Sequence, residues 1–358
     1  MIDYIISLKE LMHMTTYNIA KNREHFNFLG RSDIADGKLI MDMTDAGLEF
    51  CADLEGDITF TYDSTVYGTR KIGLVLDDNY NNIYSMVLSP EAGSATFRLC
   101  IIKGVHNVKL YKLSEYKQGG LALTDISFNG TFCETPEKPR LKFEFYGDSL
   151  TCGYGNLSVD RTSPDHRTNL QNGLLTYCAM TARKYNAQIA AASASGFGLT
   201  ISCGGSREDI YTSFTEYLSP ERNIKWNFDN YKADVVFINL GTNDAEYCRN
   251  HPEASISFDE LHTAITDMVG IIRKHNPDCK LVFVSGVSGN MQIGEQIAVE
   301  PVYEAVAKET DNAYFINRMY NGQRGGDWHP SVEDHEDVAN MLSAELEKQI
   351  PDIFKAQG

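Results

Sequence analysis

The chain has 358 residues, of which 42% are hydrophobic and 23% are charged, and its formal net charge at pH 7 is −17. This length allows two domains of ordinary size. The negative charge argues against a nucleic-acid partner, because phosphate binding needs a basic surface. The sequence has no apolar run of about 18 residues, so we expect no segment that spans a membrane.

Residues 1–21 lack the basic region, apolar core and small-residue cleavage site of a secretory leader. We therefore expect the chain as given to be cytoplasmic, whereas a leader removed from it would make the protein secreted. The eight cysteines are scattered, without a Cys-x-x-Cys pair, and several lie in apolar segments. This pattern is typical of buried reduced thiols, so we expect no disulfide framework, no metal site and no cofactor. The oligomeric state stays open.

Between residues 37 and 132 the hydrophobic periodicity is close to two. Apolar residues alternate with polar ones at Ile58, Phe60 and Tyr62. Further apolar runs, expected as separate strands, span residues 72–76, 83–88, 97–102, 108–113 and 126–128. Turn residues such as Gly104 separate these runs, with almost no helical pattern between them. Short strands at this spacing predict an antiparallel β-sandwich.

Prolines and charges interrupt both periods in residues 134–139, which we interpret as a linker. This places an N-terminal β-sandwich domain at residues 1–135 and a second domain at residues 136–358. In the second domain apolar strands alternate with amphipathic helices, which predicts a doubly wound parallel α/β sheet. The strands are expected at residues 143–146, 188–194, 235–240, 281–285 and 313–316. The helices are expected over residues 170–185, from a capping box at Ser257 and Glu260, and from Ser331.

Ser149 follows the first of these strands, in the stretch Gly147-Asp148-Ser149-Leu150. A serine on a tight turn after a strand presents its Oγ atom to a substrate. Three further motifs end later strands or precede the last helix: Ser195-Gly196-Phe197-Gly198, Gly241-Thr242-Asn243-Asp244 and Asp327-Trp328-His329-Pro330. Ser149, Gly196, Asn243 and His329 thus stand in the order and spacing of the four sequence blocks of the SGNH, or GDSL, hydrolases. The resemblance covers about residues 141–350.

These residue types suit acyl transfer. Ser149 is a poor nucleophile at its own pKa and needs an adjacent base. His329, whose side chain titrates near neutral pH, can take that proton and return it to the leaving alcohol. The resemblance implies an oxyanion hole made by the backbone N–H groups of Ser149 and Gly196 and by the side-chain amide of Asn243. We expect glycine at position 196 because a side chain there could block the approach of the substrate oxygen.

One position departs from the resemblance. SGNH hydrolases usually carry the acid of the catalytic triad three residues before the histidine, where this chain has Gly326. Asp327 lies two residues before His329. Two arrangements stay open: either Asp327 orients His329 as the third catalytic residue, or a backbone carbonyl does so and the enzyme works with a Ser–His dyad. The other acidic residues of the motifs, Asp148 and Asp244, are expected to hold loops through backbone N–H groups.

The two-domain layout resembles carbohydrate esterase family 2, which includes acetyl xylan esterases. The matching residues are Gly147-Asp148-Ser149-Leu150-Thr151-Cys152-Gly153-Tyr154-Gly155-Asn156, Trp226-Asn227-Phe228 and Asp327-Trp328-His329-Pro330-Ser331. This resemblance implies a jelly-roll fold for the N-terminal domain. It also implies that the chain removes O-acetyl groups from acetylated plant polysaccharides or oligosaccharides such as xylan and glucomannan. Tyr154, Trp226 and Trp328 are then candidates to stack on a sugar ring.

Two other functions stay open at this point. Another SGNH esterase for short or medium chains, a lysophospholipase or a thioesterase would prefer longer acyl chains, although the sequence has no evident apolar lid. A carbohydrate-binding protein would instead use the β domain beside an inactive hydrolase domain. The presence of Ser149, Asn243 and His329 favours an enzyme over a binding protein.

Overall fold

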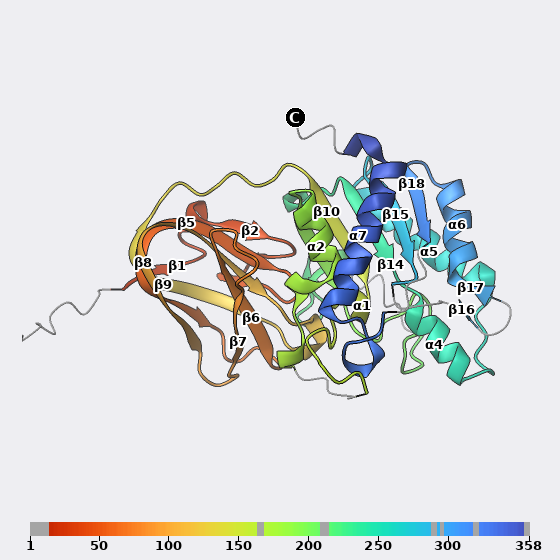
Figure 1. The fold of residues 1–358 in the computed structure, drawn as a ribbon, viewed down its shortest axis with the longest axis horizontal. Coiled ribbons are helices and arrows are strands. Elements are labelled where there is room, and N and C mark those ends of the chain that lie inside the picture. The colour runs from red at the N-terminus through yellow and green to blue at the C-terminus, as the bar shows by residue number, and fades with distance from the viewer. Residues whose placement is uncertain are drawn as a thin grey trace, which may run out of the picture.

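The computed structural model describes residues 14–162, 168–207, 215–287, 292–293, 297–317 and 322–353. Figure 1 shows two units side by side, an N-terminal one built of strands and a C-terminal one in which helices flank a sheet. None of the helices in these ranges has the length and apolar character needed to cross a bilayer.

The N-terminal unit is one antiparallel sheet of nine strands within the described residues. The strands are β1 (Thr15–Asn18), β2 (Asn27–Leu29), β3 (Asp33–Ala35), β4 (Lys38–Ile40), β5 (Gly47–Tyr62), β6 (Arg70–Leu76), β7 (Tyr84–Leu88), β8 (Ser94–Lys112) and β9 (Ala122–Phe132). Their order is β3-β4-β9-β5-β8-β6-β7, with β1 also pairing with β9 and β2 with β5. Alternate residues such as Leu48, Phe50 and Ala52 point into a core shared with β6, β8 and β9. The jelly-roll order of the strands stays a prediction.

The longest strand corrects one expectation. The runs at residues 97–102 and 108–113 are expected as two strands separated at Gly104, but residues 97–102 and 108–112 belong to the single strand β8. The strand continues through Gly104, with an irregularity nearby: Cys100 adopts a left-handed φ of 49°, and the pairing of β5 with β8 shifts register on both sides of Gly56. A bulge of this kind absorbs extra residues without ending the strand.

The C-terminal unit contains a parallel sheet in the order β11-β10-β14-β15-β18. Its strands are β10 (Lys142–Gly147), β11 (Gln188–Ser193), β14 (Val235–Asn239), β15 (Lys280–Ser285) and β18 (Ala313–Asn317), which confirms the five predicted from the sequence. Because β10 lies between β11 and β14, the winding of the chain reverses beside β10. Open α/β sheets bind their ligands in the crevice outside the carboxyl ends of the strands at such a reversal.

Helices cover both faces of this sheet, as Figure 1 shows. They are α2 (Tyr177–Lys184), α4 (Thr242–Asn250), α5 (Phe258–His275), α6 (Val299–Glu309) and α7 (Val332–Gln349). Helices α2 and α7 share a core with Phe145 and Phe237, whereas α5 and α6 share one with Tyr146 and Ile238. Neighbouring residues of a strand point to opposite faces, so the two helix pairs lie on opposite sides of the sheet. The predicted doubly wound α/β architecture is confirmed.

The first helix begins later than the sequence predicts. Within the expected helix 170–185, residues 173–175 form a separate 3₁₀ turn and α2 begins only at Tyr177. Asn172 accounts for the difference, because its side chain caps that turn by accepting the backbone N–H group two residues later. Thr176 then caps α2 in the same way with its hydroxyl.

The other two predicted helix starts are confirmed. Ser257 caps α5 and forms a capping box with Glu260, and Ser331 does the same for α7 with Asp334. The remaining elements are α1 (Ser149–Cys152), β12 (Tyr217–Ser219), β13 (Ile224–Lys225), β16 (Gln292–Ile293), β17 (Ile297–Ala298) and the 3₁₀ helices η1 (Arg23–His25), η2 (Tyr116–Gln118), η3 (Thr168–Leu170), η4 (Gly173–Leu175), η5 (Phe228–Asn230), η6 (Gly326–Trp328) and η7 (Pro351–Ile353).

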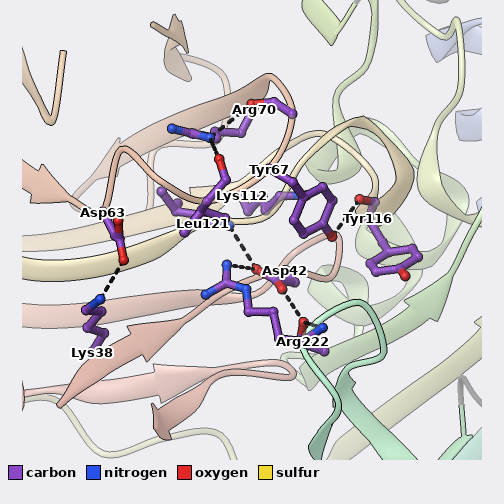
Figure 2. Close-up of polar contacts among 12 residues, drawn as sticks. Lys38, Asp42, Asp63, Tyr67, Arg70, Lys112, Tyr116, Leu121 and Arg222 are labelled. Carbon is purple, nitrogen blue, oxygen red and sulfur yellow. Dashed lines mark hydrogen bonds and ion pairs between the residues drawn. The ribbon is translucent and has the colours of Figure 1, made fainter. Parts of the chain in front are cut away.

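Buried polar contacts join the two units. Asp42, which follows β4, is fully buried and accepts the backbone N–H of Leu121 at 2.8 Å (Figure 2). From the C-terminal unit, the Ser219 hydroxyl lies 2.5 Å and the Arg222 guanidinium 2.7 Å from the same carboxylate. A buried carboxylate is costly without such partners, so Asp42 fixes how the two units meet.

A second buried pair crosses the same boundary. Arg31, between β2 and β3, lies 2.8 Å from the carboxylate of Glu144 on β10, and neither side chain has exposed area. Arg31 also donates a hydrogen bond to the Tyr146 hydroxyl at 2.7 Å. The strand that ends just before Ser149 is therefore tied to the N-terminal unit.

Candidate active site

Ser149 lies where β10 passes directly into α1. Position 147 requires glycine, because a Cβ atom there would lie 1.9 Å from Oγ1 of Thr151. Asp148 then caps α1 by accepting the backbone N–H of Leu150 at 3.0 Å, and Gly153 ends it in a left-handed conformation. The tight strand–helix turn places Ser149 at the carboxyl end of the sheet, beside the reversal of winding.

His329 faces this serine from the segment just before α7. Its Nε2 atom lies 2.8 Å from Oγ of Ser149, which is hydrogen-bond distance. A nucleophile and a base in contact at this distance form the minimal pair for covalent acyl transfer. The structure thus brings together the two residues that the sequence separates by 180 positions.

The other ring nitrogen of His329 determines which tautomer is present. Nδ1 lies 2.7 Å from the backbone carbonyl oxygen of Asp327. A carbonyl oxygen only accepts hydrogen bonds, so Nδ1 carries the proton and Nε2 keeps the lone pair that faces Ser149. Of the two arrangements left open by the sequence, the geometry has the backbone carbonyl rather than the Asp327 carboxylate at Nδ1.

The backbone around Asp327 is folded to aim that carbonyl. Asp327 and Trp328 have φ angles of 51° and 59°, in the left-handed region that non-glycine residues rarely adopt. Backbone strain of this kind costs on the order of 1–3 kcal/mol per residue and is found where function requires it. The Trp328 N–H group, which donates to the carbonyl of Arg161 at 3.0 Å, helps to hold the turn.

Gly326, at the usual position of the triad acid, has no room for a side chain. A Cβ atom there would lie 2.9 Å from Cβ of Ser158. Its N–H group donates to the carbonyl of Gly155 at 2.9 Å, so this backbone packs directly on the segment that follows Ser149. The close packing explains why an acid is absent from position 326.

Burial lowers the pKa of His329 below its ordinary value of 6.5, and the carbonyl and carboxylate of Asp327 oppose this shift. The lowered pKa keeps the imidazole neutral at neutral pH. A neutral imidazole is the form that can accept the Ser149 proton.

Gly196 lies in the turn that follows β11, the strand paired with β10, which leads to Ser149. Its φ angle is +82°, and a Cβ atom would lie 2.6 Å from Sγ of Cys203. Free approach of a substrate oxygen stays a prediction, and the structure adds two local reasons for glycine. The left-handed backbone and the Cys203 thiol each disfavour a side chain at this position.

Asn243 is the second residue of α4, directly after β14. Its Nδ2 atom donates to the carbonyl of Phe197 at 2.8 Å and to the Asp148 carboxylate at 3.3 Å. The amide therefore bridges the turns that follow β10 and β11. Ser149, Gly196 and Asn243 come from three adjacent strands and lie at one edge of the sheet, as predicted.

The two other acidic motif residues hold loops, as predicted. Asp244 accepts the backbone N–H groups of Leu199, Thr200 and Ile201 at 2.7–3.0 Å. Asp148 accepts that of Leu150, and burial raises the pKa of its carboxyl group to about 7. No group of three or more His, Cys, Asp or Glu side chains within the described ranges is placed to hold a metal ion.

The three predicted sugar-stacking residues lie in different surroundings. Trp328 is 47% exposed, next to His329, with the Arg161 guanidinium 4.1 Å from its ring centroid. Tyr154 is buried, and its ring centroid lies 4.5 Å from that of the His329 ring. Trp226 lies in the core beneath the guanidinium of Arg31, so its ring cannot stack on a sugar. We withdraw Trp226 from the candidate site.

Two residues of the N-terminal unit reach this site and were missed by sequence reasoning. The Glu115 carboxylate accepts both the backbone N–H of Ser195 at 2.8 Å and its hydroxyl at 2.9 Å. Nζ of Lys117 lies 2.9 Å from the Ser195 carbonyl oxygen. Both residues precede the linker and belong to no motif, so only the fold reveals that they border the segment that contains Gly196.

Residues 145–342 match the sequence model of the GDSL-like lipase/acylhydrolase family. The chain belongs to this family. The matched range begins on β10, ends in α7 and includes Ser149, Gly196, Asn243 and His329. The GDSL-like unit is therefore the C-terminal α/β unit, and the N-terminal sheet lies outside the match.

Curated relatives of this GDSL-like chain include two esterases. The cellulase/esterase CelE of Acetivibrio thermocellus is 29% identical over 274 residues, which cover 73% of this chain but only 32% of CelE. The chain thus spans about a third of that relative. An acetylxylan esterase/glucomannan deacetylase of Cellvibrio japonicus is 25% identical over 310 residues, 80% of this chain and 84% of the relative.

Solved structures share the fold of both units. A family two carbohydrate esterase from Clostridium thermocellum, solved in complex with cellohexaose, is 24% identical and has a TM-score of 0.80. The match covers 91% of this GDSL-like chain and 99% of that one. A family two carbohydrate esterase from Cellvibrio japonicus matches with a TM-score of 0.79 at 20% identity, over 96% of this chain and 98% of that one.

Proposed function

We propose that this chain is a serine esterase that removes O-acetyl groups from acetylated polysaccharides or oligosaccharides of the xylan and glucomannan type. The observation that carries the proposal is the 2.8 Å contact between Ser149 Oγ and Nε2 of His329, with Nδ1 of His329 bound to a backbone carbonyl. The naming of the relatives as acetylxylan esterase/glucomannan deacetylase and as cellulase/esterase supports this substrate class.

The reaction has two halves. Oγ of Ser149 attacks the acetyl carbonyl carbon while Nε2 of His329 takes its proton. The tetrahedral intermediate collapses when His329 passes that proton to the departing sugar oxygen, which leaves an acetyl group on Ser149. A water molecule, deprotonated by His329, then attacks the acyl carbon, and acetate leaves as Ser149 regains its proton.

Negative charge that develops on the acetyl oxygen needs donors held in place before the reaction. We assign this role to the backbone N–H groups of Ser149 and Gly196 and to Nδ2 of Asn243. The 3.3 Å contact of Asn243 with Asp148 is its weaker hydrogen bond, so an oxyanion can compete for that hydrogen. One such donor contributes about 3–4 kcal/mol to transition-state stabilisation.

We assign Trp328 to substrate binding, because its half-exposed ring lies next to the base. A sugar ring that stacks on it would present a nearby acetyl group to Ser149. The complex of a related esterase with cellohexaose supports a cleft that accepts a chain of linked sugars. We further propose that residues 1–135 form a jelly-roll domain and residues 136–358 the catalytic domain.

The experiment compares hydrolysis of p-nitrophenyl acetate and p-nitrophenyl octanoate by the wild-type chain and by Ser149→Ala. Acetylated xylo- and manno-oligosaccharides follow, with released acetate as the readout. Acetate turnover that disappears in Ser149→Ala and extends to the oligosaccharides supports the proposal. A preference for octanoate would indicate a lipid-directed esterase, and a folded protein without turnover would indicate a carbohydrate-binding protein.

A further inference from the structure

We propose that Glu115 and Lys117 of the N-terminal unit are positioning residues for catalysis, because together they fix the peptide group that supplies the N–H of Gly196 to the oxyanion. The inference rests on the proposed function, which assigns that N–H as an oxyanion donor. It gives the β unit a part in the reaction itself.

Lys117 contacts the carbonyl side of this peptide. Its Nζ atom lies 2.9 Å from the carbonyl oxygen of Ser195, which belongs to the same peptide group as the N–H of Gly196. The ammonium group also lies 5.1 Å from the ring centroid of Phe197, so it contacts residues on both sides of Gly196. Lys117 is itself exposed and has no part in the core.

Glu115 holds the preceding peptide group and side chain. Its buried carboxylate accepts the Ser195 N–H at 2.8 Å and the Ser195 hydroxyl at 2.9 Å. The backbone N–H of Glu115 donates to Oε1 of Gln171 at 3.1 Å, and the carbonyl of Glu115 accepts from the buried Nζ of Lys112 at 2.9 Å. The backbone of Glu115 is therefore held by one residue of each unit, Lys112 of the β unit and Gln171 of the C-terminal unit.

The geometry of a trans peptide makes these contacts relevant to catalysis. The C=O and N–H of one peptide group lie in one plane and point in opposite directions, so fixing the Ser195 oxygen also fixes the direction of the Gly196 N–H. A cation at the oxygen polarises the peptide group and makes its N–H a stronger donor. A preorganised donor needs no rearrangement when the oxyanion forms.

The test uses Lys117→Met, which keeps the apolar stem and removes the ammonium group, and Lys117→Arg, which keeps the charge. Lys103→Met is the matched control, because Lys103 is an exposed lysine on β8. Initial rates on p-nitrophenyl acetate are divided by the number of active sites titrated with a phosphonate that labels Ser149. Inhibition by phenylboronic acid, which forms a tetrahedral adduct with a serine, reports on the oxyanion site separately.

We expect Lys117→Met to lower kcat about tenfold, less than the loss of a complete oxyanion donor, with KM changed less than about twofold. The inhibition constant of phenylboronic acid should rise by a similar factor, and Lys117→Arg should recover most of both losses. Lys103→Met should match the wild type. Glu115→Gln, which removes the charge that holds Ser195, should show the same loss of kcat per titrated site.

Wild-type kcat and boronate inhibition in Lys117→Met would overturn the inference. So would a loss of activity that merely follows a loss of titratable sites, because this would be a structural effect. Ser149→Ala distinguishes a failure of the proposed function from a failure of this inference. If Ser149→Ala stays active, the proposed function is wrong. If Ser149→Ala is inactive and Lys117→Met is fully active, only the positioning role of Lys117 and Glu115 is refuted.

Discussion

Nδ1 of His329 donates its proton across 2.7 Å to the backbone carbonyl of Asp327, although that residue carries a carboxylate of its own. A carbonyl has no charge to lose on acidification, so the orientation of the ring does not depend on the ionisation of an acid. A neutral carbonyl also stabilises a protonated His329 ring less than a negatively charged carboxylate in the same place would. The orientation of the base is therefore set by backbone conformation.

The backbone role of Asp327 predicts a result opposite to that of a catalytic triad. Asp327→Asn should keep kcat/KM for p-nitrophenyl acetate within about threefold of the wild type, because asparagine tolerates the left-handed φ of 51°. Loss of a carboxylate that orients a triad histidine costs about 10⁴-fold. Asp327→Val provides the contrast: a β-branched residue resists this φ, and the strain should lower kcat/KM about tenfold. A large loss in Asp327→Asn would assign the orienting role to the carboxylate.

The activity should persist to lower pH than an ordinary histidine allows. Catalysis needs the neutral imidazole, so kcat/KM falls as the pH decreases through the pKa of His329 in the folded enzyme. Burial lowers this pKa, which places the acid limb of the profile below pH 6.5. The Asp327 carboxylate raises the His329 pKa, so its removal should lower that pKa and move the acid limb to still lower pH. An acid limb of the kcat/KM profile at or above pH 6.5, or one that stays in place in Asp327→Asn, would contradict its assignment to His329.

Trp328 should affect sugar substrates and not small esters. Trp328→Asn keeps a residue suited to the left-handed φ of 59° but removes the aromatic face. We expect KM for acetylated xylo-oligosaccharides to rise about two- to tenfold, the equivalent of about 0.5–1.5 kcal/mol of ring contact, with p-nitrophenyl acetate kinetics unchanged. Trp328→Phe should recover part of the affinity. Equal losses on both substrates would instead indicate that the substitution disturbs His329.

The buried Arg31–Glu144 pair should contribute strongly to stability, because removing one partner leaves a buried charge uncompensated. Arg31→Met should lower the free energy of unfolding in urea by about 3–5 kcal/mol. Arg98→Met, on the exposed side of β8, serves as the control and should change it by less than about 0.5 kcal/mol. An Arg31→Met protein as stable as the control would show that Glu144 finds another partner or a proton.

The sequence reveals those parts of the site that depend on local spacing. The strand ahead of Ser149, the capping box at Ser257 and the position of His329 before α7 are all encoded within a few neighbouring residues. Local spacing does not reveal whether a carbonyl or a carboxylate contacts His329. That contact depends on the left-handed φ angles of Asp327 and Trp328, which neither residue type predicts.

Long-range packing sets the remaining features. Glu115 and Lys117 contact Ser195 because the chain that follows β8 lies against the C-terminal unit. Trp226 carries an aromatic ring that suits sugar stacking, yet the fold places it beneath Arg31. Periodicity also overestimated the helix at residues 170–185, where the side chain of Asn172 competes for the backbone.

The buried side chain of Arg31 limits how this chain can be shortened or recombined with other domains. A protein fragment that began after the linker would contain Glu144 on β10 without its partner Arg31. The turn at Ser195 would also lack its contacts with Glu115 and Lys117. Shuffling the N-terminal unit for an unrelated one would break the same bonds. We therefore expect the two units to fold and work only as one piece, of which the match to the GDSL-like family covers just a part.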